Sequence, residues 1–259
     1  MNHPAIGLIA AMPEEIKPLL KLVVPYRKET VDAFSLYRFN IDNAEACMIA
    51  SGMGPIKGAA AAQVLVNSCS PSVLINFGFA GGATIGPAVG DLVVANRLLF
   101  YRDLDFFPQE GLSPQLVGLV KSTLDNAGDQ GGFKVFHHGT FITAAQIIEK
   151  QTLVDLLPAD ACYPMLEMET SAVARVAKKA RIPLIAVRAV SDAADEELGF
   201  SIDEFTDREM NIRIARVLAT MARKPWIIPQ LMRLAGNAKK AGNNLAQGIK
   251  AILDHLATM

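Results

Sequence analysis

The segment that decides the fold is residues 6–23, IGLIAAMPEEIKPLLKLV, near the start of the sequence. Residues 6–11 form a short apolar run, and after Pro13 the residues at 14–23 carry apolar side chains at helical spacing. A short apolar run bounded by proline predicts a buried strand, and acids just behind a proline are typical of a helix start. The segment therefore predicts a strand followed by a helix, the repeating unit of α/β proteins.

The same alternation continues along the chain. We expect further strands at residues 46–50, 73–77, 91–95 and 184–189, and one that ends near residue 139. We expect helices at residues 14–23, 55–67, 114–127, 144–157, 170–181 and 202–222, and a glycine-rich turn after residue 77. Several strand segments are apolar on both faces, as strands covered by helices must be. The pattern predicts a single three-layer α/β domain with a twisted, mixed, mostly parallel sheet flanked by helices.

Composition narrows the class of protein. The 259 residues are 51% hydrophobic and 20% charged, which is enough to bury the core of one domain. The formal net charge of −1 gives no global reason to expect a nucleic-acid partner. The first residues carry no basic stretch, and the apolar run at 5–12 is too short for a signal peptide or a membrane span. We therefore expect a cytoplasmic protein.

The cysteines and histidines do not suggest a disulfide framework or a metal site. Cys47, Cys69 and Cys162 are odd in number, widely spaced and flanked by apolar residues, so we expect small buried hydrophobic side chains. The four histidines are not at ligand spacing with nearby acids. We expect no metal and no cofactor.

The composition shifts after residue 222, and we divide the chain into a catalytic domain at 1–222 and an extension at 223–259. The extension has six basic residues and the single acid Asp254, an apolar cluster around Trp226, and a helical pattern from about 243 to 256. One interpretation is a helix pair packed on the domain or on a second subunit. The other is an amphipathic contact with a membrane surface.

Candidate functional residues follow the apolar runs, because ligands of open parallel sheets bind outside the carboxyl ends of the strands. Glu15 follows the first run, Glu167 and Glu169 precede the helix at 170–181, and Asp192 follows the last strong strand. The glycine turns at 51–54 and 78–82 lie at two further strand ends. These turns match neither a phosphate loop nor a dinucleotide fingerprint, and tight turns needing positive φ explain them equally well.

Each acid also has a structural interpretation. Glu14 and Glu15 stand where acids normally begin a helix, and Glu169 can act as a helix cap. Asp192 can cap a following turn. The functional interpretation is favoured because three acids follow three different strand ends.

Six segments together resemble the nucleoside phosphorylase family, and in particular its methylthioadenosine/S-adenosylhomocysteine nucleosidase branch. They are IGLIAAMPEE at 6–15, SGMG at 51–54, NFGFAGG at 76–82, GDLV at 90–93, EME at 167–169 and VRAVSD at 187–192. The resemblance covers residues 5 to 220, and the EME and RAVSD motifs are its specific part. It implies a nucleoside phosphorylase-like fold, a small nucleoside as the bound partner and a homodimer.

The resemblance also implies roles for single residues. Asp192 would donate a proton toward N7 of the departing purine, with Ser191 orienting it. Glu169 would bind the ribose hydroxyls, Met168 would pack on the sugar, and Glu15 would activate the attacking water. These roles fit the chemistry, because breaking a ribosyl C–N bond builds positive charge on the sugar and negative charge on the base. The further substrate-binding positions are Phe141, which would stack on the base, Ile142, which would make backbone contacts, and Glu167, Phe79, Ala80, Gly81 and Arg188.

Departures from the family pattern bear on the substrate and the nucleophile. Phosphorylases carry a phosphate-binding arginine in the segment aligned with residues 76–79, which here has no cation, so water is the expected nucleophile. Phe79 replaces a small hydroxyl residue, and the usual Gly-Asp before the stacking aromatic is Gly139-Thr140. Together with Phe77, Phe100 and Tyr101, Phe79 suggests an apolar entrance to the site.

The extension after residue 222 is similar to that of hopanoid-associated phosphorylase-like proteins, which are implicated in removing adenine from an adenosylated hopanoid lipid. The leading hypothesis is therefore an enzyme that releases adenine hydrolytically from a 5′-substituted adenine nucleoside. The substituent would be like that of methylthioadenosine, adenosylhomocysteine or adenosylhopane. The alternatives are a phosphorolytic purine nucleoside phosphorylase, a non-catalytic flavodoxin-like nucleotide-binding module and a lipid-surface adaptor.

Overall fold

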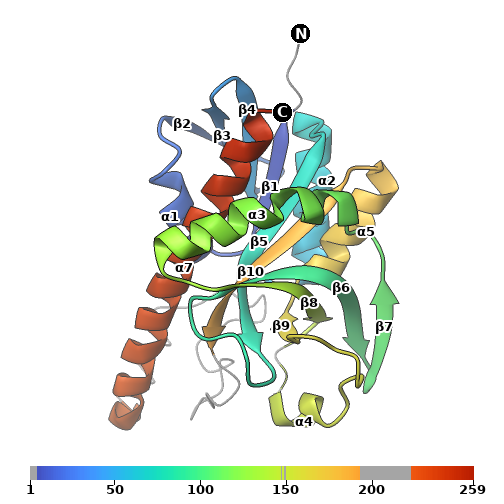
Figure 1. Ribbon diagram of the computed structural model, residues 1–259, viewed down its shortest axis with the longest axis vertical. Coiled ribbons are helices and arrows are strands. Elements are labelled where there is room, and N and C mark those ends of the chain that lie inside the picture. Colours follow the sequence, from blue (N-terminus) through green and yellow to red (C-terminus); the bar gives the residue numbers. More distant parts are fainter. Residues whose placement is uncertain (1–4, 147, 149, 193–222) are drawn as a thin grey trace.

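A computed structural model describes residues 5–146, 148, 150–192 and 223–259 of the chain (Figure 1). Its centre is one ten-stranded sheet. The strands are β1 (Ile6–Ala10), β2 (Tyr26–Val31), β3 (Phe34–Ile41), β4 (Ala44–Ala50), β5 (Val73–Gly82), β6 (Leu92–Arg102), β7 (Asp105–Gln109), β8 (Val135–Ala144), β9 (Met165–Glu167) and β10 (Leu184–Asp192). The helices are α1 (Pro13–Leu20), α2 (Pro55–Cys69), α3 (Pro114–Gly131), α4 (Lys150–Val154), α5 (Thr170–Ala180) and α7 (Ile228–Ala257), with a short 3-10 turn η2 (Pro225–Ile227).

The sheet is mixed, with parallel pairs at its centre. The order is β10-β6-β8-β9-β5-β1-β4-β3-β2, with β7 paired to β6 beside this path. Since β10 also pairs with β5, five strands close into a ring. The strand β1 is parallel to both β4 and β5, and β5 is parallel to β10. Antiparallel pairs form the edge at β2–β3–β4 and join β6 to β10. The carboxyl ends of β1, β4, β5 and β10 therefore point the same way, which positions the loops of the candidate site.

Helices cover both faces of the sheet, so the predicted three-layer α/β architecture is confirmed. One core cluster joins α1, α3 and α7 to alternate residues of the sheet, for example Leu8 and Ile75. The other joins α2 and α5 to the opposite set, for example Ile9 and Leu74. The alternation follows from the pleat of a strand, which sends successive side chains to opposite faces.

Some elements differ from their expected bounds. The glycine-rich turn after residue 77 was predicted wrongly, because β5 continues through Gly82 and pairs there with β9 and β10. The helix expected at 144–157 is wrong in extent, since β8 runs to Ala144 and α4 spans only five residues. The strands β2, β3 and β7 were not anticipated, because their polar and half-exposed residues lack a continuous apolar run. The helix expected at 202–222 lies outside the described residues.

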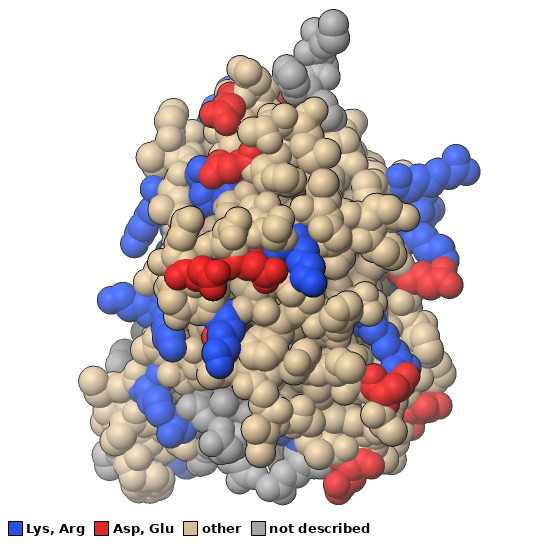
Figure 2. All heavy atoms as spheres, viewed as in Figure 1, with Lys and Arg blue, Asp and Glu red and all other residues tan. Residues whose placement is uncertain are grey.

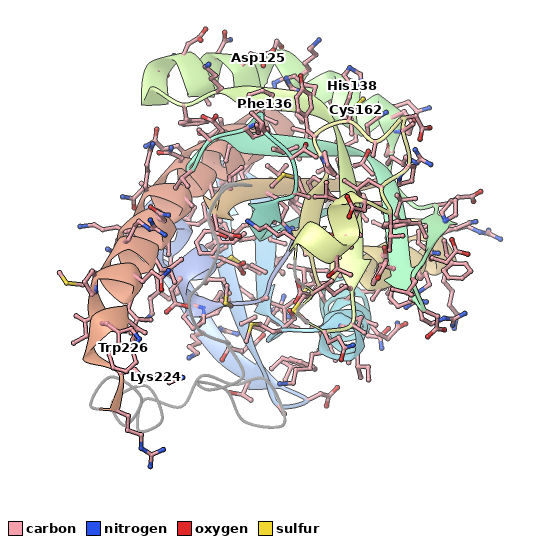
Figure 3. All side chains as sticks on the ribbon, turned by 90° about the horizontal axis from the view of Figure 1, so that it is seen from below. Asp125, Phe136, His138, Cys162, Lys224 and Trp226 are labelled. Atoms are coloured by element: carbon pink, nitrogen blue, oxygen red, sulfur yellow. The ribbon has the colours of Figure 1, made fainter. Side chains whose placement is uncertain are left out.

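The extension after residue 222 contains one long helix, α7, instead of two. Its second half is buried, and Leu245, Ile249 and Ile252 belong to the same core cluster as α1 and the sheet. Its first half is more exposed, and Figure 3 shows Lys224 and Trp226 at the outer end of this helix. Within the described part of the chain, no helix is both long and apolar enough to cross a membrane.

Charged side chains of both signs are interspersed on the face seen in Figure 2. This agrees with the near-zero formal net charge. Among the cysteines, Cys47 is buried as expected, but Cys162 is exposed. The expectation that all three are buried hydrophobic side chains is therefore wrong for Cys162.

Candidate active site

Glu15 is held by backbone donors from two strand ends. Its Oε2 accepts hydrogen bonds from the backbone N–H groups of Ala11 and Met12, both at 2.8 Å. Its Oε1 accepts one from the N–H of Phe79 on β5 at 2.7 Å. The absence of a Cβ at Gly78 makes this approach possible, since a Cβ there would lie 2.7 Å from Oε1. Glu15 therefore caps the start of α1, which is the structural role expected for an acid at this position. Its carboxylate also connects the end of β1 to β5.

The surroundings of Glu15 stabilise its protonated form relative to a carboxyl group in water. Burial raises the pKa of Glu15, and the three backbone hydrogen bonds and the charge of Arg188 oppose this rise. A carboxylate whose pKa moves toward neutrality is a better general base at neutral pH.

Glu167 belongs to a fully buried network with Arg188. Arg188 Nη2 lies 2.8 Å from Glu167 Oε2 and also donates to Asn76 Oδ1 at 2.8 Å. Thr143 donates to Glu167 Oε1, and Thr170 Oγ1 donates to Oε2 at 2.6 Å. Burial opposes ionisation of Glu167, but Arg188 and these hydrogen bonds outweigh it and hold the pKa below its ordinary value. Glu167 is thus an anion that fixes the start of α5.

Glu169 occupies the N-cap position of α5, but its side chain does not cap that helix. Its Oε1 accepts a hydrogen bond from the backbone N–H of Gly54 at 2.7 Å, just before α2. Burial raises the pKa of Glu169 to about 8, with a further rise from the negative charges of Glu167 and Glu15 and an opposing effect of Arg188. The helix-cap interpretation of Glu169 is therefore wrong, and its carboxyl group joins the ends of β4 and β9.

Asp192 ends β10 and is held from two sides. Ser191 Oγ donates to Asp192 Oδ1 at 2.7 Å, and Lys150 Nζ lies 2.6 Å from Oδ2. A Cβ at Gly81 of β5 would lie 2.7 Å from Oδ2, so this glycine leaves room for the carboxylate. The alternative expectation, that Asp192 caps a following turn, concerns residues from 193 on, which lie outside the described residues.

Glu15 and Asp192 both lie against β5, and Glu15 lies close enough to Glu169 to raise its pKa. Gly78 of β5 contacts Glu15, Gly81 of the same strand contacts Asp192, and Glu15 acts electrostatically on Glu169. Among the described residues, no group of three or more His, Cys, Asp or Glu side chains is placed to hold a metal ion.

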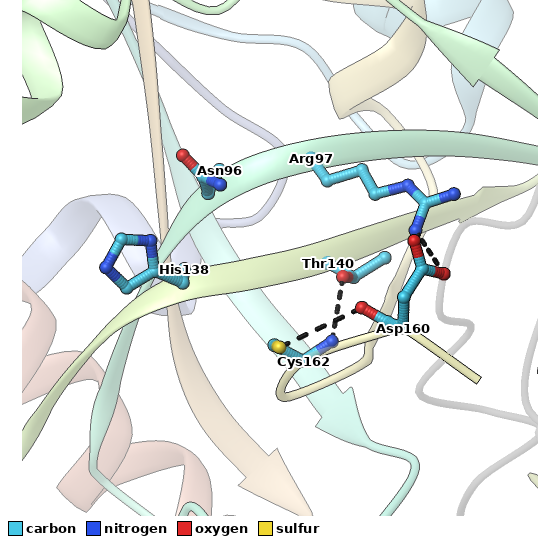
Figure 4. Close-up of a pocket in the computed structure, with 6 residues that line it drawn as sticks. All are labelled: Asn96, Arg97, His138, Thr140, Asp160 and Cys162. Carbon is cyan, nitrogen blue, oxygen red and sulfur yellow. Dashed lines mark hydrogen bonds and ion pairs between the residues drawn. The ribbon is translucent and has the colours of Figure 1, made fainter. Parts of the chain in front are cut away.

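Two surface hollows lie apart from these acids. One of about 360 Å³ is lined by Asn96, Arg97, His138, Thr140, Asp160 and Cys162 (Figure 4). In it Arg97 pairs with Asp160 at 2.7 Å. The other, of about 340 Å³, is lined by Asp125, Asp129, Phe133, Lys134, Val135 and Phe136. Neither contains one of the three acids, so the candidate site rests on the side-chain contacts above.

Comparison with known families identifies the fold and its chemistry class. Residues 5–223 match the model of the Phosphorylase superfamily. This chain belongs to that superfamily. A 5′-methylthioadenosine/S-adenosylhomocysteine nucleosidase of Listeria welshimeri is 32% identical over 217 residues, covering 77% of this chain and 91% of that protein. The nucleosidase of the same name from an Exiguobacterium species is 28% identical over 233 residues, covering 85% and 97%.

Solved structures agree with the superfamily fold over nearly the whole chain. A Helicobacter pylori 5′-methylthioadenosine/S-adenosylhomocysteine nucleosidase with butyl-thio-DADMe-Immucillin-A has a TM-score of 0.73 and 20% identity, covering 98% of this chain and 99% of that chain. The native futalosine hydrolase of the same organism has a TM-score of 0.70 and 19% identity, covering 97% of both. The chain is an enzyme of the nucleosidase and nucleoside phosphorylase type.

Most of the other positions expected to bind substrate are buried side chains. Phe141 is fully buried, with the Arg188 guanidinium 5.8 Å from its ring centre, and Ile142 is fully buried in a small cluster near β9. Ala80 is buried and its carbonyl accepts from Ser191 Oγ at 3.4 Å, while Met168 is half-buried. Their contacts with a nucleoside stay predictions.

The expectation that Phe77 and Phe79 form an apolar entrance to the site is wrong. Phe77 is 1% exposed and belongs to the core between the sheet and α7. The ring of Phe79 also points toward α7, where a Cβ at Gly242 would lie 3.5 Å from its Cζ. The physical reason is that β5 is a central strand covered on this face by a helix, so its aromatic side chains fill the core.

Three residues of this site were missed in the sequence. Asn76 and Thr143 complete the network of Arg188 and Glu167, and Lys150 pairs with Asp192. Asn76 had a usable signal, since it is the one polar residue within the apolar run at 73–77. Lys150 had none, because a lone lysine gives no indication of its partner.

Proposed function

We propose that the chain hydrolyses the N-glycosidic bond of an adenine nucleoside and releases adenine, with water as the nucleophile. The observation that carries the proposal is the position of the buried Glu15 carboxyl group. It occupies the backbone N–H donors of Ala11, Met12 and Phe79, so these donors are not free to bind phosphate. Because an ionised Glu15 would repel phosphate, the arrangement favours activation of a neutral water molecule.

Arg188 and Lys150 lie near this end of the sheet, and each is already paired with an acid, Glu167 and Asp192 respectively. Arg188 is 1% exposed and its charge is neutralised by Glu167. A buried guanidinium that already pairs with a carboxylate has little net charge to offer a phosphate ion. The same reasoning supports hydrolysis over phosphorolysis.

The roles of the other acids follow from the charge that develops as the bond breaks. Glu169 would contact the ribose hydroxyls, where its negative charge or its hydrogen bonds stabilise a cationic sugar. Asp192, oriented by Ser191, would protonate the departing base. The nucleosidases that resemble this chain are named for two adenine nucleosides with 5′-sulfur substituents, and this supports adenine as the base.

The test is adenine release from purified chain with and without phosphate. Free ribose product in the absence of phosphate is expected, whereas a ribose 1-phosphate product that requires phosphate would establish phosphorolysis. Asp192→Asn should lower kcat by at least about a hundredfold with an unchanged Tm. The matched control is Asp129→Asn, an exposed carboxylate on α3. Equal adenine release by both variants and the unsubstituted chain would contradict the role of Asp192, and no release by any of them would support a non-catalytic binding module.

We further propose that the segment at 223–240 contacts an anionic membrane surface and that the 5′ substituent is a hopanoid-type lipid. Residues 223–253 contain six basic residues and no acid. Trp226 in η2 and Met232 in the first half of α7 are each 71% exposed. Basic residues beside exposed apolar side chains are typical of surface-binding helices.

Sedimentation with phosphatidylglycerol vesicles tests the membrane proposal. The doubly substituted chain Trp226→Ala, Met232→Ser should lose binding and keep its activity on water-soluble nucleosides. Ile56→Ser is the control, because Ile56 is 85% exposed on α2, away from the basic segment. Binding that survives the double substitution contradicts the proposal. Adenine release from methylthioadenosine, adenosylhomocysteine and adenosylhopane then decides the 5′ substituent.

Two further proposals concern organisation. We retain residues 1–222 as the catalytic domain and 223–259 as an extension, although the second half of α7 packs in the domain core. We also propose a homodimer, which light scattering coupled to size-exclusion chromatography tests directly. A mass of one chain, 27.8 kDa, would contradict it.

A further inference from the structure

Two of the three cysteines, far apart in the sequence, meet beneath α2. Cys47 lies on β4 and is fully buried, whereas Cys69 is the last residue of α2 and is half-buried. Both belong to the core cluster between α2 and the sheet. The two thiols lie close enough for each to shift the pKa of the other. Neither is part of the candidate active site, and no role described above uses this contact.

Arg38 connects the two thiols. It stands directly opposite Cys47 in the β3–β4 ladder, and its Nη1 donates to Cys47 Sγ at 3.3 Å. Its Nη2 donates to the carbonyl of Ser68 at 3.3 Å, next to Cys69 at the end of α2. A single guanidinium thus spans the strand and the helix end. This geometry holds a positive charge beside both sulfur atoms.

Two carboxylates fix the position of Arg38. Glu29 Oε1 lies 2.8 Å from its Nε, and Glu45 Oε1 lies 3.1 Å from its Nη1. Glu45 Oε1 is also 3.8 Å from Cys47 Sγ. These acids partly offset the positive charge, so the influence of Arg38 on the thiols depends on its closeness to them.

The surroundings of the two thiols differ. The Cys47 thiol lowers the pKa of the Cys69 thiol, and Arg38 lowers it further against the opposing effect of burial. The Cys69 thiol and burial raise the pKa of the Cys47 thiol. A half-exposed thiol with a lowered pKa beside a buried partner thiol has the features of a redox-active pair, in which the first attacks and the second resolves.

We propose that Cys47 and Cys69 are a reversible dithiol–disulfide site that hydroperoxides oxidise. The Cys69 thiolate attacks one peroxide oxygen, the O–O bond breaks, and a sulfenic acid and water form after one protonation. The Cys47 thiol then attacks the Cys69 sulfur, an S–S bond forms and a second water leaves. Two thiols are oxidised and one hydrogen peroxide is reduced to two waters, so the step balances.

The disulfide would close a ring that contains a loop of the candidate active site. Residues 51–54 lie between the two cysteines, and Gly54 in this loop donates its N–H to Glu169. Cross-linking the start and the end of the β4–α2 unit limits the motion of the chain between them. The oxidised chain is therefore expected to unfold at a higher temperature than the reduced chain.

Thiol counting and peptide mapping on the full-length chain test the proposal. The reduced chain is treated with hydrogen peroxide and denatured, and its thiols are titrated with Ellman's reagent. Two of the three thiols should disappear, a Cys47–Cys69 linked peptide should be found, and dithiothreitol should restore all three. In Cys162→Ser the loss of two thiols should persist, because the exposed Cys162 does not take part. In Cys69→Ser no linked peptide should form.

Two outcomes would overturn the proposal. One is irreversible oxidation of Cys69 with Cys47 still a free thiol. The other is thiol loss that occurs only through intermolecular pairing of Cys162.

The contribution of Arg38 has its own readout. Alkylation of Cys69 by iodoacetamide near neutral pH should slow by about threefold or more in Arg38→Gln and less in Arg38→Lys, which keeps the charge. Arg27→Gln is the matched control, since Arg27 is an exposed arginine that contacts Glu29 and no thiol. Equal rates in all four chains would show that Arg38 does not activate this site.

Discussion

Replacing Glu169 by glutamine should change how the stability of the fold depends on pH. Burial and the neighbouring acids raise the pKa of Glu169 to about 8, above its ordinary value of 4.5. The folded chain therefore keeps a proton on Glu169 that the unfolded chain releases. Between these two pH values the unfolded state binds fewer protons, so stability falls as pH rises and becomes level above the folded-state pKa.

The size of this effect follows from the same two values. Each pH unit between the unfolded-state and folded-state pKa values of Glu169 changes the free energy of unfolding by about 1.4 kcal/mol, so the whole effect is at most about 5 kcal/mol. Glu167, separated from Glu169 by one residue, stays ionised over this range, and part of the rise at Glu169 comes from its negative charge. We therefore expect about 2–5 kcal/mol of stability to be lost through Glu169 between about pH 5 and about pH 9. A glutamine has no proton to release, and its Oε1 can still accept from the N–H of Gly54.

Urea unfolding of both chains at about pH 5 and about pH 9 measures the difference. The stability loss in Glu169→Gln should be smaller than in the unsubstituted chain by about 2–5 kcal/mol, because all other titrating groups are shared. Glu14→Gln, an exposed acid on α1, is the control and should behave like the unsubstituted chain. Equal pH dependence of the Glu169→Gln chain and the unsubstituted chain would refute the reasoning, since it would mean that Glu169 is ionised in the fold.

Two further substitutions test the geometry of the site. Gly78→Ala would place a Cβ 2.7 Å from Glu15 Oε1, so it should displace this carboxylate, abolish most adenine release and cost about 1–3 kcal/mol in urea unfolding. The control is Gly118→Ala on α3, where the new Cβ meets open space, so this substitution should raise stability by about 0.5–1 kcal/mol and leave activity unchanged. If Gly78→Ala behaved in the same way, the close contact between Gly78 and Glu15 would be contradicted. Arg188→Met should destabilise the fold by about 3–5 kcal/mol, because it leaves Glu167 as an unpaired buried charge. Urea unfolding measures this loss, and an unchanged stability would mean that Glu167 takes up a proton instead.

The layers of the fold were predictable because they follow from local periodicity. The strand and helix at 6–23, and the helices at 55–67 and 170–181, appear within a few residues of their expected bounds. The strands β2 and β3 were not predictable in this way. Their half-exposed residues pair at the sheet edge, where one face meets solvent and an apolar run is not required. The strand character of Gly78 and Gly81 was hidden for another reason, because glycine normally signals a turn.

The acids of the site were found in the sequence, but their partners were not. Glu15, Glu169 and Asp192 were selected because they follow strand ends, and parallel strands bring such positions to one edge. The contact of Glu169 with Gly54 depends on how α5 packs against α2, which involves residues 115 positions apart. Packing of this kind is set by the tertiary fold and leaves no periodic pattern in the sequence.

The EME motif at 167–169 places two carboxyl groups in opposite electrostatic surroundings. Arg188, Thr143 and Thr170 stabilise the anion at Glu167, whereas Glu169 has one backbone donor and a negative neighbour. A pair of acids whose pKa values are pushed apart can serve two functions at one pH. Glu167 can then hold the start of α5 as a permanent anion, while Glu169 exchanges its proton near neutral pH. Arg188 lowers the pKa of Glu15 and Glu169 as well as that of Glu167, but burial outweighs this effect at Glu15 and Glu169, so the paired Glu167 is the acid that Arg188 keeps ionised.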